Sequence, residues 1–193
     1  MYNFNFNSFL QTNNILYQYQ FGFRKNHSTT LALLDVVDQI YAHLDKHESV
    51  VGVYLDLKKA FDTVNHAILL HKLYNYGIRG VVYEWFRNYL HNRTQFVTVN
   101  ECNSEVGVPQ GSLLGPLLFL IYLNDIHEAV PGDKLKLYAD DTNLFVCSSN
   151  LQSVADETNI LLSKLNKWFI ANKLSLSLEK NLLYGIWISR ESW

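Results

Sequence analysis

The chain has 193 residues, of which 48 % are apolar and 18 % charged, and this composition excludes a disordered protein. Lys and Arg number 16 against 18 Asp and Glu, so the formal net charge of −2 excludes an overall positive field that would attract nucleic acid or an anionic membrane. A nucleic-acid partner would therefore need a local basic groove.

The sequence predicts an intracellular protein without a membrane segment. Cys102 and Cys147 are too few for a disulfide framework or a zinc site, so a reducing compartment is expected. The longest apolar run, Leu113 to Leu123, is well short of the ~20 residues that cross a bilayer. Because Met1 to Phe9 contain no basic stretch followed by an apolar one, no secretory signal is expected, and the nucleus or the cytoplasm is the predicted location.

The first half of the chain alternates predicted helices with one predicted strand. The segment up to Gln20 is weakly patterned, but apolar residues at every third or fourth position predict a helix from Thr29 to Leu44, capped by Ser28 or Thr29. The β-branched segment Val50 to Leu55 predicts a buried strand that ends at Asp56. Two packing helices follow, one from the cap Asn65 to Gly77 and one from Val81 to Leu90.

The second half predicts strands around two further helices. Residues 94–99 and 104–108 are expected to be strands, and the nearly apolar segment 115–129 a buried helix with Pro116 in its first turn. Residues 135–138 and 143–147 predict a hairpin with acids at its tip, followed by an amphipathic helix over 151–171 and one or two strands within 174–189. This mixture predicts an α+β fold, an antiparallel sheet with helices packed on one face.

Three acids, Asp56, Asp140 and Asp141, end or connect predicted strands. Two carboxylates ~4 Å apart repel by about 4 kcal/mol at an effective dielectric near 20, and a bound cation removes that cost. Oxygen ligands without a soft ligand favour Mg²⁺, and two such ions roughly 3.5 to 4 Å apart serve in-line phosphoryl transfer. The alternatives are a pair of turn residues at 140 and 141 and a strand-ending Asp56.

Four segments in order resemble the motifs of a known enzyme family. YLDLKKAFDTV within residues 53–64, VPQGSLLGPLLFLIYLND at 108–125 and LYADDT at 137–142 resemble motifs A, B and C of reverse transcriptases. QFGFRKNHSTTLAL at 20–33 resembles the fingers motif of non-LTR retrotransposon (LINE, jockey-like) enzymes. The resemblance extends from Gln20 to about Lys180.

The resemblance implies a polymerase palm with part of the fingers and without thumb or endonuclease. Residues 1–193 would form a single partial reverse transcriptase domain, with a fingers remnant at 1–49 and the palm at 50–193. The implied activity is RNA-directed DNA synthesis, in which a primer 3′-hydroxyl attacks the α-phosphate of a dNTP with two Mg²⁺ ions, or Mn²⁺, as cofactor. The implied partners are an RNA template, a DNA primer and dNTPs.

The same resemblance implies a role for each matching residue. Asp56 and Asp140 would be catalytic and bridge the metal ions, with Asp141 as the third acid and the backbone carbonyl of Leu57 as a further ligand. The nucleotide-binding set is Phe61 as a steric gate against ribose, Gln110, Gly111, Arg24 at the triphosphate and Lys180 of motif D; Tyr138 and Lys25 would contact primer and template. The structural alternatives are a core Phe, an ordinary turn at 110–111 and solvated basic side chains.

Two other functions stay open at this point. Asn181 stands where the family usually has Thr and the tail from Leu182 no longer follows the pattern, so the chain could be an inactive truncated remnant that at most binds nucleic acid. An RNA-templated RNA polymerase or another palm nucleotidyltransferase would share the acids. Phe61 disfavours ribonucleotide use, because a polymerase that incorporates ribonucleotides is expected to have a smaller residue at that position.

Overall fold

The computed structural model describes residues 5–91, 95–99, 102–104, 107–108 and 114–177, and the chain divides into two compact units. The sheet unit contains residues 18–58, 126–171 and 175–193. The helical unit contains residues 1–17, 59–125 and 172–174. Each unit contains residues from both sides of position 50, so these units do not test the expected division into fingers (1–49) and palm (50–193). That division stays a prediction.

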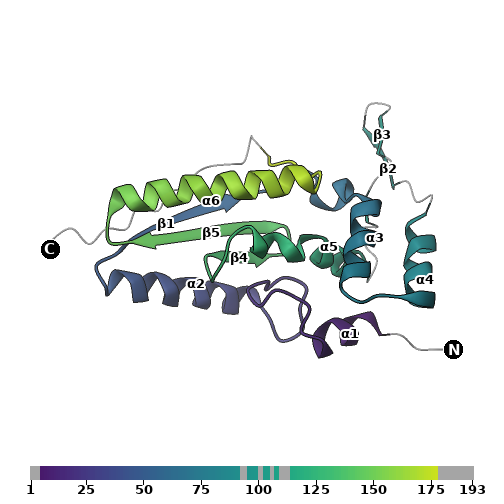
Figure 1. Cartoon of the computed structure of the whole chain (residues 1–193), viewed down its shortest axis with the longest axis horizontal. Helices are drawn as coiled ribbons and strands as arrows, with labels where there is room; N and C mark the ends of the chain where they lie inside the picture. Colours follow the sequence, from purple (N-terminus) through teal and green to yellow (C-terminus); the bar gives the residue numbers. More distant parts are fainter. Residues whose placement is uncertain (1–4, 92–94, 100–101, 105–106, 109–113, 178–193) are drawn as a thin grey trace. The chain divides into compact units, whose positions relative to one another are not determined.

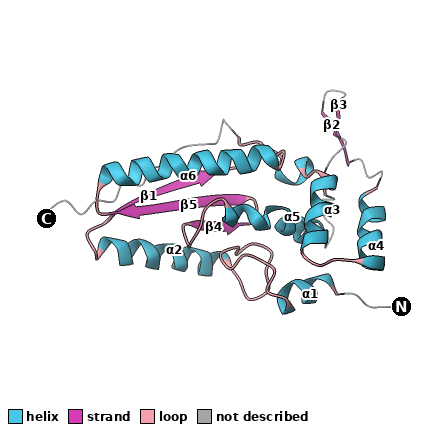
Figure 2. Cartoon of the chain, viewed as in Figure 1, coloured by secondary structure: helices cyan, strands magenta, loops and turns pink. Residues whose placement is uncertain are grey.

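An antiparallel sheet forms the centre of the sheet unit. Its strands are β1 (Ser49–Leu55), β4 (Leu135–Tyr138) and β5 (Asp141–Ser148), in the order β1-β5-β4 (Figures 1 and 2). Helix α2 (Thr29–Leu44) packs against β1 and β4, and helix α6 (Leu151–Ala171) packs against β1 and β5. The predicted α+β class with an antiparallel sheet and packed helices is confirmed.

The two faces of this sheet differ in polarity. The register pairs Leu55 with Thr142, Val53 with Leu144 and Leu135 with Leu144, and successive side chains of a strand point to opposite faces. One face is buried throughout and comprises Val51, Val53, Leu55, Leu135, Leu137, Thr142, Leu144 and Val146. The opposite face is buried at Val50, Lys136 and Phe145, and its more exposed residues, Tyr54, Tyr138, Asp141 and Asn143, gather at the end of the sheet where β1 ends and β5 begins.

The helical unit contains a largely buried helix, α5 (Leu114–Leu123), whose residues 118–123 are all buried. Helix α3 (His66–Asn75) packs against α5 and against α4 (Gly80–Leu90), and the rings of Phe6 and Phe86 lie 5.0 Å apart between α1 (Phe6–Thr12) and α4. The remaining elements are the hairpin β2 (Gln95–Val99) and β3 (Cys102–Ser104) and the 3₁₀ helix η1 (Ala60–Thr63). A second 3₁₀ helix, η2 (Asn124–Glu128), follows α5, and its residues 126–128 are counted with the sheet unit. Burial on all sides explains the nearly continuous apolar sequence of α5.

Polar residues at the end of α5 connect the segments of the helical unit. The buried Lys72 donates to the carbonyl of Tyr122 and to Oδ1 of Asp125, both at 2.6 Å. Oδ1 of the buried Asn124 accepts the N–H of Tyr17 at 2.7 Å, and its Nδ2 donates to the carbonyl of Ile15 at 2.8 Å. Buried polar groups of this kind require partners, so these residues determine how the segments join.

Most predicted elements are confirmed. The helix over Thr29–Leu44 has its cap at Ser28, whose hydroxyl accepts the N–H of Leu31 at 3.2 Å, and Asn65 caps α3. The helices at 80–90 and 151–171 and the hairpin of β4 and β5 also lie where their patterns predict them. Among the described helices, none combines the length and hydrophobicity needed to span a membrane.

Three local predictions were wrong or extend outside the described residues, and one helix was missed. The helix expected over 115–129 ends at Leu123 and continues as η2, where the side chains of Asn124 and Asp125 bond to other segments. Strand β3 is Cys102–Ser104 instead of 104–108. Helix α1 was not predicted, although Asn5 caps it and Phe6, Phe9 and Leu10 have helical spacing, because seven residues are too few for a reliable periodic signal. Of the strands expected within 174–189, a bridge between Leu57 and Leu176 is described, and residues 178–193 lie outside the described residues.

The substitution Asp125→Asn is expected to destabilise the protein by about 2 kcal/mol, because it leaves the buried Lys72 ammonium without a counter-charge. The effect is below the ~3–5 kcal/mol of fully buried pairs, since the Asp125 side chain is 27 % exposed. Urea denaturation measures the change in the free energy of unfolding. In the matched control Glu84→Gln, which breaks an exposed pair with Arg87, the expected loss is under about 0.5 kcal/mol, and equal losses would contradict the assignment.

Candidate active site

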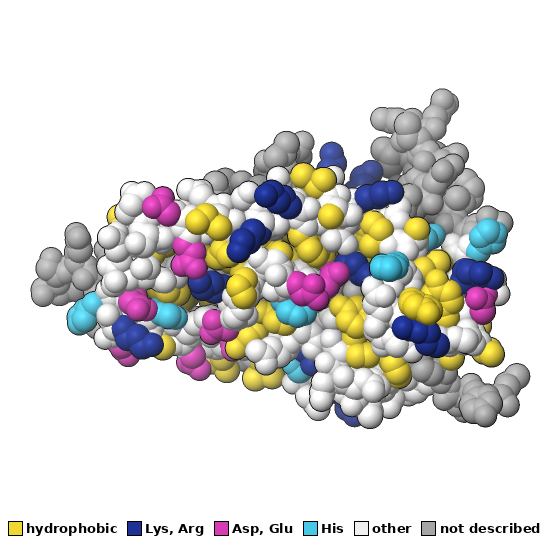
Figure 3. Space-filling view, viewed as in Figure 1, with side chains coloured by type: hydrophobic (Ala, Val, Ile, Leu, Met, Phe, Trp, Pro, Cys, Tyr) yellow, Lys and Arg dark blue, Asp and Glu magenta, His cyan; other side chains and the backbone are white. Residues whose placement is uncertain are grey.

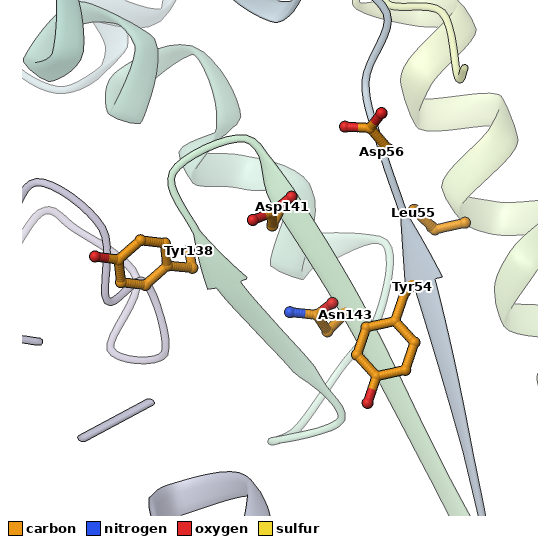
Figure 4. A pocket seen from close by; sticks show the side chains of 6 residues that line it. All are labelled: Tyr54, Leu55, Asp56, Tyr138, Asp141 and Asn143. Carbon is orange, nitrogen blue, oxygen red and sulfur yellow. The ribbon is translucent and has the colours of Figure 1, made fainter. Parts of the chain in front are cut away.

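A pocket opens on the polar face of the sheet unit, where β1 ends and the β4–β5 hairpin turns. It is lined by Tyr54, Leu55, Asp56, Tyr138, Asp141 and Asn143 (Figure 4). In Figure 4 the carboxylates of Asp56 and Asp141 lie at the same end of their strands, with Asn143 and Tyr54 further along the sheet. Two of the three acids singled out in the sequence therefore share one pocket.

The strand register explains why these two acids meet. The last pair of the β1–β5 ladder is Leu55 with Thr142, so the next position along the ladder sets Asp56 opposite Asp141. Directly opposite side chains have Cβ atoms about 4.5–5.5 Å apart, and like charges in such a pair destabilise a sheet. A cation between the two carboxylates would remove that repulsion.

Asp140 lies in the turn immediately before β5 and is half-buried. It is not among the residues that line the pocket, although it directly precedes Asp141. Within the described ranges, no group of three or more His, Cys, Asp or Glu side chains is arranged to hold a metal ion. The structure thus brings Asp56 and Asp141 together and leaves Asp140 beside them.

The donor set of the pocket fits a hard divalent cation. Asp56 and Asp141 supply carboxylate oxygens, Asn143 supplies an amide oxygen, and the lining contains no thiol or imidazole. Mg²⁺ is commonly held by one or two protein carboxylates, with water and substrate phosphate supplying the other ligands. A pair of facing acids is therefore sufficient on the protein side.

The backbone at Leu57 is also oriented by its neighbours. Lys58 donates its N–H to the carbonyl of Ser175 at 2.8 Å, and Ser177 donates to the carbonyl of Asp56 at 2.9 Å. Because alternate residues of an extended strand direct their backbone groups to opposite sides, the carbonyl of Leu57 points away from the 175–177 segment. Its role as an oxygen ligand, which the resemblance implies, stays a prediction.

Tyr54 and Asn143 were missed by the sequence analysis. Each is two positions from one of the acids on the same strand, and the period of two that puts alternate residues on one face was the signal that could have found them. The ring of Tyr54 lies edge-on to Phe145, with centroids 6.1 Å apart. Tyr138, which the sequence analysis did select, lines the same pocket.

The predicted phosphate ligands Arg24 and Lys25 lie in the sheet unit. Nη1 of Arg24 donates to the carbonyls of Gln20 at 3.1 Å and Gln18 at 3.4 Å, and burial lowers the pKa of its guanidinium from the ordinary value. Arg24 therefore stabilises its own loop, while Lys25 is exposed. Contacts of either residue with triphosphate or template stay predictions.

Phe61 belongs to the helical unit, where its ring stacks on the buried Phe119 at 4.4 Å between centroids. Its carbonyl accepts the N–H of Val108 at 2.9 Å. Gly107 has φ +134°, and a Cβ there would lie 3.0 Å from Cα of Asp62, so the chain entering motif B passes too close for a side chain. The steric-gate role of Phe61 stays a prediction, and Gln110, Gly111 and Lys180 lie outside the described residues.

Charge on the visible surface is mixed. On the face drawn in Figure 3, described Lys and Arg side chains lie along the upper part, and others lie beside Asp and Glu further down.

Comparison with known proteins identifies relatives over most of the chain. Residues 3–184 match the family model described as reverse transcriptase (RNA-dependent DNA polymerase). The chain is 34 % identical over 137 residues to the RNA-directed DNA polymerase from mobile element jockey of Drosophila melanogaster, and 34 % identical over 150 residues to the probable RNA-directed DNA polymerase from transposon BS of the same species. These alignments cover 65 % and 72 % of the chain but 15 % and 16 % of the relatives.

A solved structure has a similar fold. The chain superimposes on telomerase from Candida albicans, solved in complex with the TWJ fragment of telomeric RNA, with a TM-score of 0.56 and 12 % sequence identity. The match covers 97 % of this chain and 34 % of the telomerase chain. At this identity the similarity concerns the fold alone.

The substitution Asp141→Asn is expected to stabilise the metal-free protein by about 0.5 kcal/mol, because it removes one of two facing charges on a solvent-exposed position. The same variant should lose most of the rise in unfolding temperature that Mg²⁺ produces, since the cation loses a carboxylate ligand. Thermal unfolding in EDTA and in millimolar Mg²⁺ measures both effects. The control Asp38→Asn, an exposed acid of α2, should change neither, and a full Mg²⁺ response in Asp141→Asn would contradict the assignment.

Proposed function

The chain belongs to the reverse transcriptase (RNA-dependent DNA polymerase) family, and we propose that it forms the catalytic centre of an RNA-directed DNA polymerase of a non-LTR retrotransposon. The observation that carries the proposal is that Asp56 and Asp141 line one pocket directly beyond the last pair of the β1–β5 ladder, in the positions of motifs A and C. In the proposed reaction a primer 3′-hydroxyl forms a bond to the α-phosphate of a dNTP, and pyrophosphate leaves.

Members of this family use divalent metal ions, and the proposed cofactor is a pair of Mg²⁺ ions, with Mn²⁺ as a substitute. Asp56, Asp140, Asp141 and the carbonyl of Leu57 would hold them. When bound, the ions would increase the nucleophilicity of the attacking hydroxyl and stabilise the charge of the leaving pyrophosphate. The hard oxygen donors of the pocket support this assignment.

The protein's own contribution is positioning. Strands β1 and β5 are neighbours in a sheet whose other face is buried, so the backbone that carries both carboxylates is rigid. Tyr138 lines the same pocket and supplies an aromatic surface for a base at the primer terminus. The proposed partners are an RNA template, a DNA primer and dNTPs, in the nucleus or the cytoplasm.

Phe61 and Arg24 complete the proposal as nucleotide-binding residues, together with Gln110, Gly111 and Lys180. The role of Phe61 rests on its place in motif A, five residues after Asp56. Its ring stacks on Phe119, a contact that restrains the ring, and a restrained ring suits steric exclusion of a 2′-hydroxyl. Lys25 is proposed to contact the template backbone.

Primer extension on an RNA template with Mg²⁺ tests the activity, both with this chain and with a version extended at its two ends. Asp140→Ala is expected to reduce the rate by about a thousandfold, because a metal ligand contributes several kcal/mol to the transition state. The exposed Asp38→Ala is the matched control and should be active. Extension that is unaffected by Asp140→Ala would refute the assignment, whereas a wild-type protein without extension and without thermal stabilisation by Mg²⁺ and dNTP would be an inactive remnant.

The substitution Phe61→Val is expected to raise the incorporation of ribonucleotides relative to deoxynucleotides by roughly 10- to 100-fold, since it opens space for the 2′-hydroxyl. Single-nucleotide extension with paired rNTP and dNTP measures the ratio of kcat/KM values. Phe86→Leu, which shortens a buried aromatic residue of the helical unit, serves as control for destabilisation. If Phe61 has only a core function, both variants will lose stability and neither will change the ratio.

A further inference from the structure

A short segment outside the recognised catalytic acids contacts the turn that carries them. Tyr19 to Phe21 lie beside β4: the N–H of Leu137 donates to the carbonyl of Tyr19 at 2.9 Å, and the N–H of Phe21 donates to the carbonyl of Leu137 at 2.8 Å. Gln20 forms a parallel bridge with Leu137, and its side chain is 2 % exposed. The buried amide of Gln20 therefore lies against the end of β4, where the turn begins.

That amide bonds to both backbone polar groups of one turn residue. Oε1 of Gln20 accepts the N–H of Ala139 at 3.1 Å, and Nε2 donates to the carbonyl of Ala139 at 3.4 Å. Oε1 also accepts the N–H of Gly22 at 2.8 Å. Because Ala139 is itself buried, these bonds replace those that water would otherwise make.

Ala139 needs such support because its backbone is in the left-handed region, with φ +56°. Residues with a side chain rarely adopt this conformation, and it persists where surrounding contacts impose it. Gly22 contributes from the other direction: a Cβ at Gly22 would lie 2.2 Å from the backbone nitrogen of Ala139. The turn is thus fixed by hydrogen bonds from Gln20 and by close packing of Gly22.

The group that restrains the turn, the Gln20 amide, carries no charge, and this suits a position beside Asp140 and Asp141. Asp140 follows Ala139 directly, and Asp141 faces Asp56 across the ladder, so the free turn would relax to separate the like charges. A basic side chain in place of Gln20 would resist this movement but would compete with a bound cation for the carboxylates. An uncharged amide holds the backbone without altering the charge of the site.

We propose that Gln20 is a positioning residue for the catalytic acids: it fixes the left-handed turn at Ala139 and so directs Asp141 towards Asp56, with Asp140 beside them. The inference rests on the proposed function for the role of the acids, but the restraint on the turn is a property of the free chain. Arg24 in turn helps to hold the backbone of Gln20, because Nη1 of Arg24 donates to the carbonyl of Gln20 at 3.1 Å.

Hydrogen–deuterium exchange on the 193-residue chain tests the restraint without substrate or metal. In Gln20→Met, which keeps the volume and removes the polar atoms, exchange of the peptide spanning residues 137–143 should quicken by about tenfold or more relative to a peptide from α6. In Gln20→Glu, which keeps the oxygen that accepts two N–H groups, exchange should stay within about threefold of wild type. Gln39→Met is the matched control, because Oε1 of Gln39 is buried without a hydrogen-bond partner among the described residues.

The pattern of outcomes separates positioning from packing. If Gln20 only fills space, Met will be tolerated and Glu will be harmful, which would overturn the proposal. Should Gln20→Met unfold the whole chain, the exchange of Gln20→Glu decides: slow exchange in the turn supports the proposal and fast exchange confined to the turn refutes it. Equal behaviour of Gln20→Met and Gln39→Met also refutes it.

Two functional measurements complete the test. Tb³⁺ serves as a luminescent probe of the cation site at Asp56 and Asp141. Its affinity should be lower in Gln20→Met than in wild type and unchanged in Gln39→Met. In primer extension, Gln20→Met should lower kcat while leaving KM for the dNTP within about twofold, because the acids and not the nucleotide contacts are displaced. If wild-type chain extends no primer, the proposed function fails, and the exchange result still decides whether Gln20 holds the turn.

Discussion

The antiparallel register between β1 and β5 is the constraint on which the candidate site depends. Pairing Leu55 with Thr142 leaves Asp56 opposite Asp141 at the next position, on the same face of the sheet as Tyr54 and Asn143. A shift by one residue would turn every side chain of one strand to the other face and bury its acid. The hydrophobic residues on the buried face therefore set the geometry of the polar one, and stability and chemistry are determined by the same ladder.

Contacts on both sides of this ladder hold its open end in place. Segment 19–22 lies beside β4 and bonds to Ala139, while segment 175–177 lies beside the continuation of β1 and orients the carbonyl of Leu57. Each contact restrains backbone next to an acid without adding charge to the pocket. A pair of like charges that must stay close until a cation arrives needs such support, because repulsion would otherwise move the strand ends apart.

Local pattern predicted much of the fold, and the exceptions have identifiable causes. The helices at 29–44 and 151–171 are long and periodic, so sequence spacing alone was sufficient to find them. The helix at 6–12 and the early end of α5 at Leu123 were not predicted, because both depend on contacts with other segments: Phe6 packs on Phe86, and Asn124 bonds to Ile15 and Tyr17. These contacts have no local signature.

The sequence by itself determined the family, the three acids and the ends of the strands that carry them, because motif order and strand ends are properties of neighbouring residues. The tertiary structure decided which acids meet, since Asp56 and Asp141 face each other through a pairing of distant strands. It also revealed Gln20, whose partner Ala139 is 119 positions away. An isolated buried amide has no periodicity in the sequence, so the contacts that give it a role are visible only when the chain is folded.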